Sequence, residues 1–266
     1  MLTSALIKPA DGVARMRQAS ALVAGALEMI AAHVRPGITT AALDRLCHDF
    51  IADHGGVPAC VGYQGYRHAS CISVNQVVCH GVPGDRVLRD GDLLNIDLVA
   101  AVDGWHGDSS AMFIAGRPTV AGERLARLTQ QALYLGIQAV KPGARLDAIG
   151  TAIQRHAQAH GLSVVRDYAG HGIGRQMHEA PDVLHYHTGT PGITLLPGMT
   201  FTIEPMLNAG AAACRTLADG WTVVTRDRSL SAQWEHTVLV TDDGVEVLTL
   251  RPSERARWQA QAQPGG

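Results

Sequence analysis

The segment 93-LLNIDLVAAVDGWHGDSSAMFI-114 decides the fold, because it predicts a buried β-hairpin that carries acidic residues. Asp103-Gly104 is a strong two-residue turn signal with apolar residues on both sides. A tight turn there places Asp108 opposite Val99, so Asp97 lies on the same face and diagonal to Asp108. Two acids on one face of an apolar ribbon repel each other and lose hydration, and a divalent cation between them resolves the conflict. A solvent-facing acidic ladder on an edge hairpin is the alternative.

The composition is that of a globular protein with a sizeable core. Of its 266 residues, 46% are hydrophobic and 17% charged, and the net charge of -2 gives no basic field for nucleic acid or an acidic membrane. The N-terminus lacks a secretory signal, and no apolar run approaches the roughly 20 residues that span a bilayer. The five cysteines form no Cys-x-x-Cys pair, which suits reduced thiols. These features predict a cytoplasmic protein without direct nucleic-acid specificity.

Apolar spacing predicts four helices, over about 11–34, 40–54, 120–140 and 144–160, with Thr39 or Thr40 capping the second. Strands are expected over 69–78, 93–114, 200–207, 221–225 and 234–241. We expect a single domain over 1–250. The polar segment 251–266 is expected to be a flexible tail.

A duplication runs through this order of elements. The stretch 34-VRPG-37 is echoed by 140-VKPG-143, and His-Gly ends the helix that follows each, at the same offset of 106 residues. At an offset of 107, Asp97 matches Glu204, each preceded by isoleucine and by a glycine six residues upstream. Two similar halves, about 9–115 and 120–250, are therefore predicted around a pseudo-twofold axis, with Asp97 and Glu204 as symmetry-related neighbours.

The second half supplies three further candidate ligands. His171 lies in the glycine-rich turn 170-GHGIG-174, Glu204 in 201-FTIEPM-206 and Glu235 in 233-QWEHT-237. A lone glutamate in a strand usually faces solvent, but these strands are apolar on both sides. Four carboxylates and one neutral imidazole suit two divalent metal ions such as Co, Mn, Fe or Zn. Two such ions can activate a water molecule between them.

Several other motifs are incomplete. Arg175 stands where G-x-G-x-x-G requires a further glycine, so a dinucleotide site is not indicated. His178-Glu179 begins like H-E-x-x-H, but Asp182 replaces the second histidine and Pro181 would break the helix that this motif requires. His178 is better explained as an acid or hydrogen-bond donor at the site.

These residues, in their surrounding stretches, resemble the methionine aminopeptidases, and in length the chain resembles the short bacterial type I form. The resemblance extends from about residue 9 to 250 and rests on the stretches VCHG, NID, DGWHGDSS, GHGIG, HEAPDVLHY, LLPGMTFTIEPM, DGWTVVT and SAQWEHT. It implies the α+β pita-bread fold, with two pseudo-symmetric halves around a central antiparallel sheet. It also implies removal of the initiator methionine when the next residue is small.

Roles for the five ligands follow from the resemblance. It implies that Asp97 holds one metal, that His171 and Glu204 hold the other, and that Asp108 and Glu235 bridge the two. A bridging water or hydroxide would attack the methionyl carbonyl, and Glu204 would shuttle its proton.

The resemblance also assigns residues around the substrate. His178 would hydrogen-bond the scissile peptide, and His80 would position the substrate near the amide nitrogen. The positions that match the family's methionine pocket are Cys60, Tyr63, Tyr66, Cys71, Met177 and Trp221. Ordinary core packing is the alternative for each of these pocket residues. A monovalent cation site is implied by Asn75, Val77 and Ser231.

Departures from the family pattern concern the pocket rim and not the ligands. Met177 stands where Phe is common, Gln76 where an acid is common, and Arg67-His68 where Pro-Lys is frequent. Prolidases carry an additional N-terminal domain, and the interval from Glu204 to Glu235 leaves no room for the insertion of the type II enzymes.

The resemblance implies a monomer that acts on N-terminal methionine peptides and nascent chains, with transient ribosome association. A pita-bread scaffold that has lost catalysis and binds partners is the alternative from another class of function.

Overall fold

The hairpin at the centre of the fold has the predicted register. The computed structural model describes residues 6–262, and it contains β4 (Leu93–Val102) and β5 (Trp105–Ile114) as an antiparallel pair. Val99 pairs with Asp108, and Val102 with Trp105. Asp103 and Gly104 have φ values of 50° and 75°, the left-handed pair that a two-residue hairpin turn of this kind requires.

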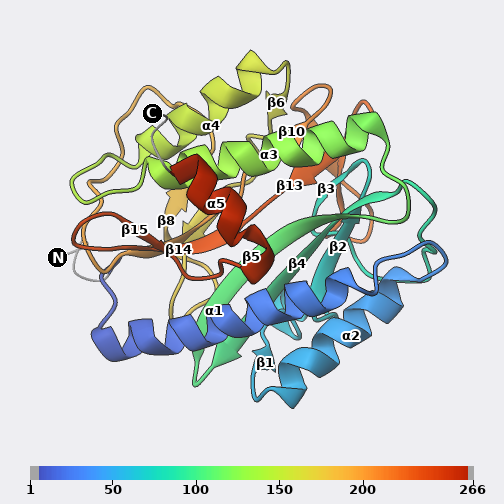
Figure 1. Cartoon of the computed structure of the whole chain (residues 1–266), viewed down its shortest axis with the longest axis horizontal. Coiled ribbons are helices and arrows are strands. Elements are labelled where there is room, and N and C mark those ends of the chain that lie inside the picture. Colours follow the sequence, from blue (N-terminus) through green and yellow to red (C-terminus); the bar gives the residue numbers. More distant parts are fainter. Residues whose placement is uncertain (1–5, 263–266) are drawn as a thin grey trace.

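The first half packs two helices against this hairpin. Helix α1 (Ala10–Ala31) lies across β4 and β5, and α2 (Thr40–Asp53) packs beside α1, as Figure 1 shows along the lower side of the molecule. Thr39 Oγ1 accepts a hydrogen bond from the Ala42 amide, so Thr39 is the cap of the second helix. Three short strands complete this half: β1 (Val57–Pro58), β2 (Ser70–Val74) and β3 (Val77–Cys79).

The second half repeats the plan. Helices α3 (Val120–Gln138) and α4 (Asp147–Ala159) pack together along the upper side of Figure 1, with the strands between the two helix pairs. Thr119 caps α3 by accepting from the Gly122 amide. The strands are β6 (Ser163–Val164), β7 (Gly170–Gly172), β8 (Glu179–Val183), β9 (Thr200–Ile203), β10 (Met206–Asn208), β11 (Cys214–Thr216), β12 (Val223–Thr225), β13 (Ser231–Gln233), β14 (His236–Val240) and β15 (Val245–Val247).

The duplication seen in the sequence is also present in the pairing of the strands. Val57 of β1 pairs with Ala101 of β4, and Ser163 of β6 pairs with Asn208 of β10. These two pairs are related by the same steps of 106 and 107 residues that relate the repeats in the sequence. The named strands pair antiparallel and form four small sheets: β5-β4 with β1 and β2, β13-β10-β6, β11-β12-β3, and β15-β14-β9-β7-β8.

Two predicted strands are interrupted at acidic residues. The strand expected over 200–207 divides into β9 and β10 at Glu204-Pro205, because Pro205 has no amide to donate to a ladder. The strand expected over 234–241 begins only at His236, so Glu235 lies in the break between β13 and β14. Both glutamates therefore sit where the backbone leaves one sheet for another.

The segment expected to be a flexible tail contains structure. Residues 252–254 form a 3-10 turn and α5 (Arg255–Ala262) follows, crossing the front of Figure 1 between α3 and α1. Glu254 is buried because Gln130 and Tyr134 of α3 donate to its carboxylate and Arg251 pairs with it at 2.9 Å. Residues 263–266 of the expected tail lie outside the described residues.

Candidate metal centre and substrate pocket

One cavity of about 680 Å³ collects the candidate residues from both halves. All the residues assigned above to metal binding, catalysis and the methionine pocket line it: Cys60, Tyr63, Tyr66, Cys71, His80, Asp97, Asp108, His171, Met177, His178, Glu204, Trp221 and Glu235. The acidic hairpin therefore faces an internal cavity, which excludes the solvent-facing ladder.

The carboxylate of Asp108 is fixed by a contact between the halves. Asp108 is buried in β5, and its amide donates to Thr237 Oγ1 of β14 at 3.1 Å. The same hydroxyl donates to the Asp108 carbonyl oxygen at 2.7 Å. This reciprocal pair holds the β5 backbone against β14, so the Asp108 side chain projects into the cavity from a fixed position.

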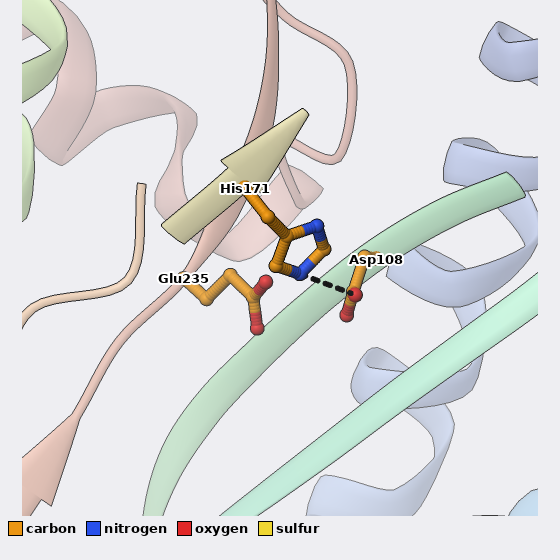
Figure 2. A group of neighbouring side chains, drawn as sticks. All are labelled: Asp108, His171 and Glu235. Carbon is orange, nitrogen blue, oxygen red and sulfur yellow. Dashed lines mark ion pairs between the residues drawn. The ribbon is translucent and has the colours of Figure 1, made fainter. Parts of the chain in front are cut away.

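Glu235 is also held by hydrogen bonds between the two halves, which together we call the seam. Its amide donates to the Ser110 carbonyl oxygen at 3.2 Å, and Ser109 Oγ donates to the Glu235 carbonyl oxygen at 2.6 Å. Its side chain is buried and points toward Asp108 and His171, as Figure 2 shows. Ligand atoms of Asp108, His171 and Glu235 all lie within 4.8 Å of one another.

His171 of β7 presents one ring nitrogen to the acids. Its Nδ1 lies 3.0 Å from the Gly172 carbonyl oxygen, which accepts a hydrogen bond from the protonated nitrogen. The lone pair is then on Nε2, which lies 3.7 Å from Asp108 Oδ2 and 3.6 Å from Glu204 Oε1 (Figure 2 shows the contact with Asp108). A backbone acceptor on Nδ1 is the arrangement that orients a metal-binding histidine.

Glu204 is oriented by three polar neighbours. Thr202 Oγ1 donates to Glu204 Oε1 at 2.8 Å and accepts from the His171 amide at 2.9 Å, which ties the two side chains together. Gln233 Nε2 donates to Glu204 Oε2 at 3.3 Å. The Glu204 amide donates to Nε2 of His185, a fully buried histidine whose pKa burial lowers to about 3.

Burial and mutual repulsion disfavour the ionised forms of the four acids. Burial raises the pKa of Asp97 to about 7 and that of Glu204 to about 8. Burial and the neighbouring carboxylates raise the pKa of Asp108 and Glu235 well above the ordinary range. Burial also lowers the pKa of His171 to about 4, so its imidazole is neutral at pH 7.

The donor set fits divalent metal ions. Asp97 Oδ1 and both carboxylate oxygens of Glu235 are buried and lack a hydrogen-bond partner among residues 6–262. Buried carboxylate oxygens without partners are costly unless they are protonated or coordinate a cation. Oxygen ligands with one imidazole suit first-row divalent ions.

Two further histidines lie beside this cluster. The ring centroid of His178, in the loop before β8, is 4.1 Å from that of His171, and its Nδ1 contacts the Tyr63 hydroxyl at 2.8 Å. His80 follows β3 with a φ of 54° and packs edge-on against Tyr168 at 5.5 Å. A left-handed backbone is uncommon for residues other than glycine, and such conformations cluster at functional sites.

The pocket beside the acids is apolar and built mostly from loops, with Cys71 contributed by β2. The rings of Tyr66 and Trp221 lie 4.9 Å apart, and the Tyr66 hydroxyl donates to the Ser70 carbonyl oxygen. Burial raises the pKa of the Cys60 and Cys71 thiols, so both line the cavity as neutral, apolar groups. Met177 is 7% exposed and completes this wall.

The residues expected at a monovalent cation site come close together. The Ser231 amide donates to the Asn75 carbonyl oxygen at 2.9 Å, and Val77 follows in β3. Ser231 Oγ is buried and has no hydrogen-bond partner in the described part of the chain. The Asn75 side chain is engaged with Asp92 and the Leu93 amide.

Sequence reasoning missed the residues that orient the ligands. Thr202, Thr237, Gln233 and His185 each contact a ligand residue, yet none has a motif of its own. The signal that could have found them is their position: three lie within two residues of Glu204 or Glu235. His185 ends the polar stretch 178-HEAPDVLH-185 and is placed only by the fold.

Comparisons with known proteins show what this chain is similar to in sequence and in fold. The model of metallopeptidase family M24 matches residues 14–242. Methionine aminopeptidase of Salmonella typhimurium is 56% identical over 250 residues, covering 93% of this chain and 95% of its own. The crystal structure of methionine aminopeptidase from Rickettsia prowazekii is similar with a TM-score of 0.90 and 48% identity, covering 92% of this chain and 99% of that chain.

More distant structures share only the fold. Prolidase from Pyrococcus horikoshii has a TM-score of 0.73 at 20% identity, covering 92% of this chain and 64% of that one.

Among the described residues, the helices are too short or too polar to cross a membrane.

Proposed function

Because this chain belongs to the methionine aminopeptidases of metallopeptidase family M24, which remove N-terminal methionine in a metal-dependent hydrolysis, we propose that its five cavity ligands hold two divalent metal ions. Asp97 would contribute to one ion, His171 and Glu204 to the other, and Asp108 and Glu235 to both. The observation that carries this proposal is the convergence of the Asp108, Glu204 and Glu235 carboxylates on His171, whose Nε2 is unprotonated. Asp97 lies beside Asp108 in the same cavity.

The metal ions, when bound, polarise a carbonyl oxygen and lower the pKa of a water molecule toward neutrality. Glu204 accepts the proton of the attacking water and passes it to the leaving amine. Thr202 and Gln233 support this role, because each donates to one carboxylate oxygen and fixes the orientation of the group. Nε2 of His185 accepts a hydrogen bond from the Glu204 amide and so fixes the backbone between β9 and β10.

The histidines at the cavity hold the peptide. His178 donates to the carbonyl oxygen of the scissile bond, where negative charge develops, and its contact with Tyr63 fixes the ring. His80, which lines the same cavity, contacts the amide nitrogen. Burial lowers the pKa of both imidazoles, so both are neutral at pH 7 and can donate and accept.

The apolar wall of Cys60, Tyr66, Cys71, Met177 and Trp221 takes the methionine side chain. A flexible thioether packs well against aromatic rings and neutral thiols. A small residue after the methionine is the preference we expect. We further propose that the enzyme acts in the cytoplasm, as a monomer, on new chains and with transient ribosome association. Asn75, Val77 and Ser231 would bind a monovalent cation.

The test is hydrolysis of Met-Gly-Met-Met and Leu-Gly-Met-Met by chelated protein, with and without added Co or Mn. Metal-dependent release of methionine with little leucine supports both the metal centre and the pocket. Release of both amino acids would keep the chemistry and overturn the assignment of the pocket. No release from folded, metal-loaded protein would favour a scaffold that binds partners without catalysis. A titration that saturates at one ion per chain would overturn the count of two.

A further inference from the structure

The segment before α1 contacts a loop that borders the substrate cavity. Residues 6–9 precede α1, and we call them the N-terminal lead. Residues 173–178, between β7 and β8, carry Met177 and His178, and we call them the rim loop. The lead and the rim loop are about 170 residues apart in sequence. Lys8 joins them.

The Lys8 ammonium is a buried charge that pairs with the Glu179 carboxylate. Its Nζ lies 2.5 Å from Glu179 Oε2, with side-chain exposures of 6% for Lys8 and 20% for Glu179. The Lys8 amide donates to the Gly198 carbonyl oxygen at 2.8 Å, and Ile7 forms a bridge with Met199. The lead is therefore fixed to the strand region around β9, and Lys8 reaches the rim loop from a fixed base.

Glu179 closes the rim loop on itself. It is the first residue of β8, directly after His178, and its Oε1 accepts from the Gln176 amide at 2.9 Å. A second bond inside the loop runs from the Gly174 amide to the Gln176 carbonyl oxygen. The Glu179 carboxylate thus joins the end of the loop to its middle, while its other oxygen is held by Lys8.

The start of the rim loop is held from the other side and packs on the lysine. The His106 amide of β5 donates to the Gly174 carbonyl oxygen at 3.0 Å. A Cβ at Gly174 would lie 2.7 Å from Lys8 Cε, so the lysine stem needs a glycine there. Between these anchors, Arg175, Gln176 and His178 are exposed. The side chains of Arg175 and His178 are held as well, by Asp103 and Trp105 and by Tyr63. The backbone of the loop is tied mainly at its start and at its end.

We infer that Lys8 is a positioning residue for the rim loop: through Glu179 it fixes where His178 and Met177 meet the substrate. This inference rests on the proposed function, since it assumes that His178 contacts the scissile peptide. Without Lys8, the Glu179 carboxylate turns toward solvent and releases the Gln176 amide. The loop then samples several arrangements, of which few place the imidazole on the carbonyl oxygen.

The test compares Lys8→Met with Lys8→Arg and with a matched control, Arg17→Met. Arg17 of α1 also pairs with an acid distant in sequence, Glu246. This pair is exposed and joins α1 to β15, not to the rim loop. Three quantities are measured for each holoenzyme: kcat and KM on Met-Gly-Met-Met, affinity for Mn, and hydrogen exchange of peptides from the rim loop and from β4–β5.

We expect Lys8→Met to lower kcat/KM roughly tenfold to a hundredfold, mostly through kcat, because small misplacements of a catalytic group have effects of this size. Exchange should accelerate in residues 174–178 and stay unchanged in β4–β5, with unchanged Mn affinity. Lys8→Arg should keep most of the activity, and Arg17→Met should stay within about twofold of the unmodified enzyme.

Two outcomes would overturn the inference. The first is a kcat/KM for Lys8→Met within about twofold of the unmodified enzyme. The second is a loss of activity that comes with weaker Mn binding or faster exchange in β4–β5. If Lys8→Met fails to fold, Glu179→Gln replaces it, because glutamine keeps an acceptor for the Gln176 amide and removes only the charge. If the unmodified enzyme releases no methionine, the proposed function fails, and exchange in the rim loop still decides whether Lys8 orders it.

Discussion

The proposed metal ligands and the proposed substrate residues line the same cavity, but they are held in different ways. Asp97 and Asp108 lie within long paired strands, and Glu235 is tied by its own backbone to β5. His178 and Trp221 lie in loops, where side-chain contacts do most of the positioning. The ligand cluster has many backbone anchors, whereas the rim has few.

This contrast separates two demands on one cavity. Metal ligands must keep fixed separations, and strand backbones joined across the two halves provide them. A pocket must admit and release peptides, which requires segments that open at low free energy. Changes at the ligands should therefore alter metal binding and chemistry, while changes at the rim should alter selectivity and leave the metals in place.

The largest effect is expected for Glu204→Gln. The substitution keeps the size of the side chain and removes the proton acceptor, so kcat should fall by roughly 10²–10⁴-fold. Steady-state kinetics, metal content and near-UV circular dichroism measure it, with Glu246→Gln in β15 as the matched control. A variant that keeps near-normal kcat with its metals bound would remove Glu204 from the mechanism.

Thr202→Val should act on the metals without touching a ligand atom. It removes the hydroxyl that accepts from the His171 amide and donates to Glu204. Loss of such an orienting partner lowers metal affinity about 10–100-fold. Titration with Mn measures it, and Thr200→Val in the same strand is the control, since Thr200 Oγ1 donates to the Ile173 carbonyl oxygen. Equal affinities in the two variants would contradict the role of Thr202.

Met177→Ala should change selectivity alone. Removing apolar contact from a pocket lowers kcat/KM for the matching substrate by about tenfold. Hydrolysis of Met-Gly-Met-Met and Leu-Gly-Met-Met at saturating Mn measures the change. An unchanged ratio for the two peptides, with lower thermal stability, would show that Met177 belongs to the core and not to the pocket.

The smallest effect is the pH dependence of the chelated protein. Folding raises the pKa of Asp97 to about 7 and of Glu204 to about 8, above ordinary values near 4. Between about pH 4 and about pH 8 the folded state therefore binds more protons than the unfolded state. The free energy of unfolding then falls as the pH rises through this range. The melting temperature should drop on the order of 5 °C from about pH 5 to about pH 8, and added Mn should raise it more at the higher pH.

Differential scanning calorimetry at several pH values measures this trend. A melting temperature of the chelated protein that rises over the same range would contradict the pKa shifts assigned to the buried acids. The double variant Asp97→Asn with Glu204→Gln is the control, because it should reduce the slope to the part that Asp108 and Glu235 contribute.

The sequence predicted those features whose signals are local. Asp103-Gly104 set the hairpin register, and the register placed Asp97 and Asp108 on one face, as the structure confirms. The duplication predicted which acid of the second half approaches Asp97. These signals work because a turn or a repeat is specified by neighbouring residues.

Contacts between distant segments could not be predicted in the same way. Glu254 looked like part of a polar tail, because its partners Gln130 and Tyr134 lie on α3. The Lys8–Glu179 pair joins residues with no common motif. In both cases a charged side chain is buried only because the fold brings a partner to it, and composition carries no record of that partner.

The seam between the halves also sets the order in which activity can arise during synthesis. The first half leaves the ribosome with Asp97 and Asp108 but without His171, Glu204 and Glu235. Because Thr237 holds Asp108 only after β14 has formed, the early chain has neither the full ligand set nor its alignment. With the proposed ligand set, a growing copy of this enzyme would stay inert until nearly all of it has been made, and it would not attack other new chains while it is still incomplete.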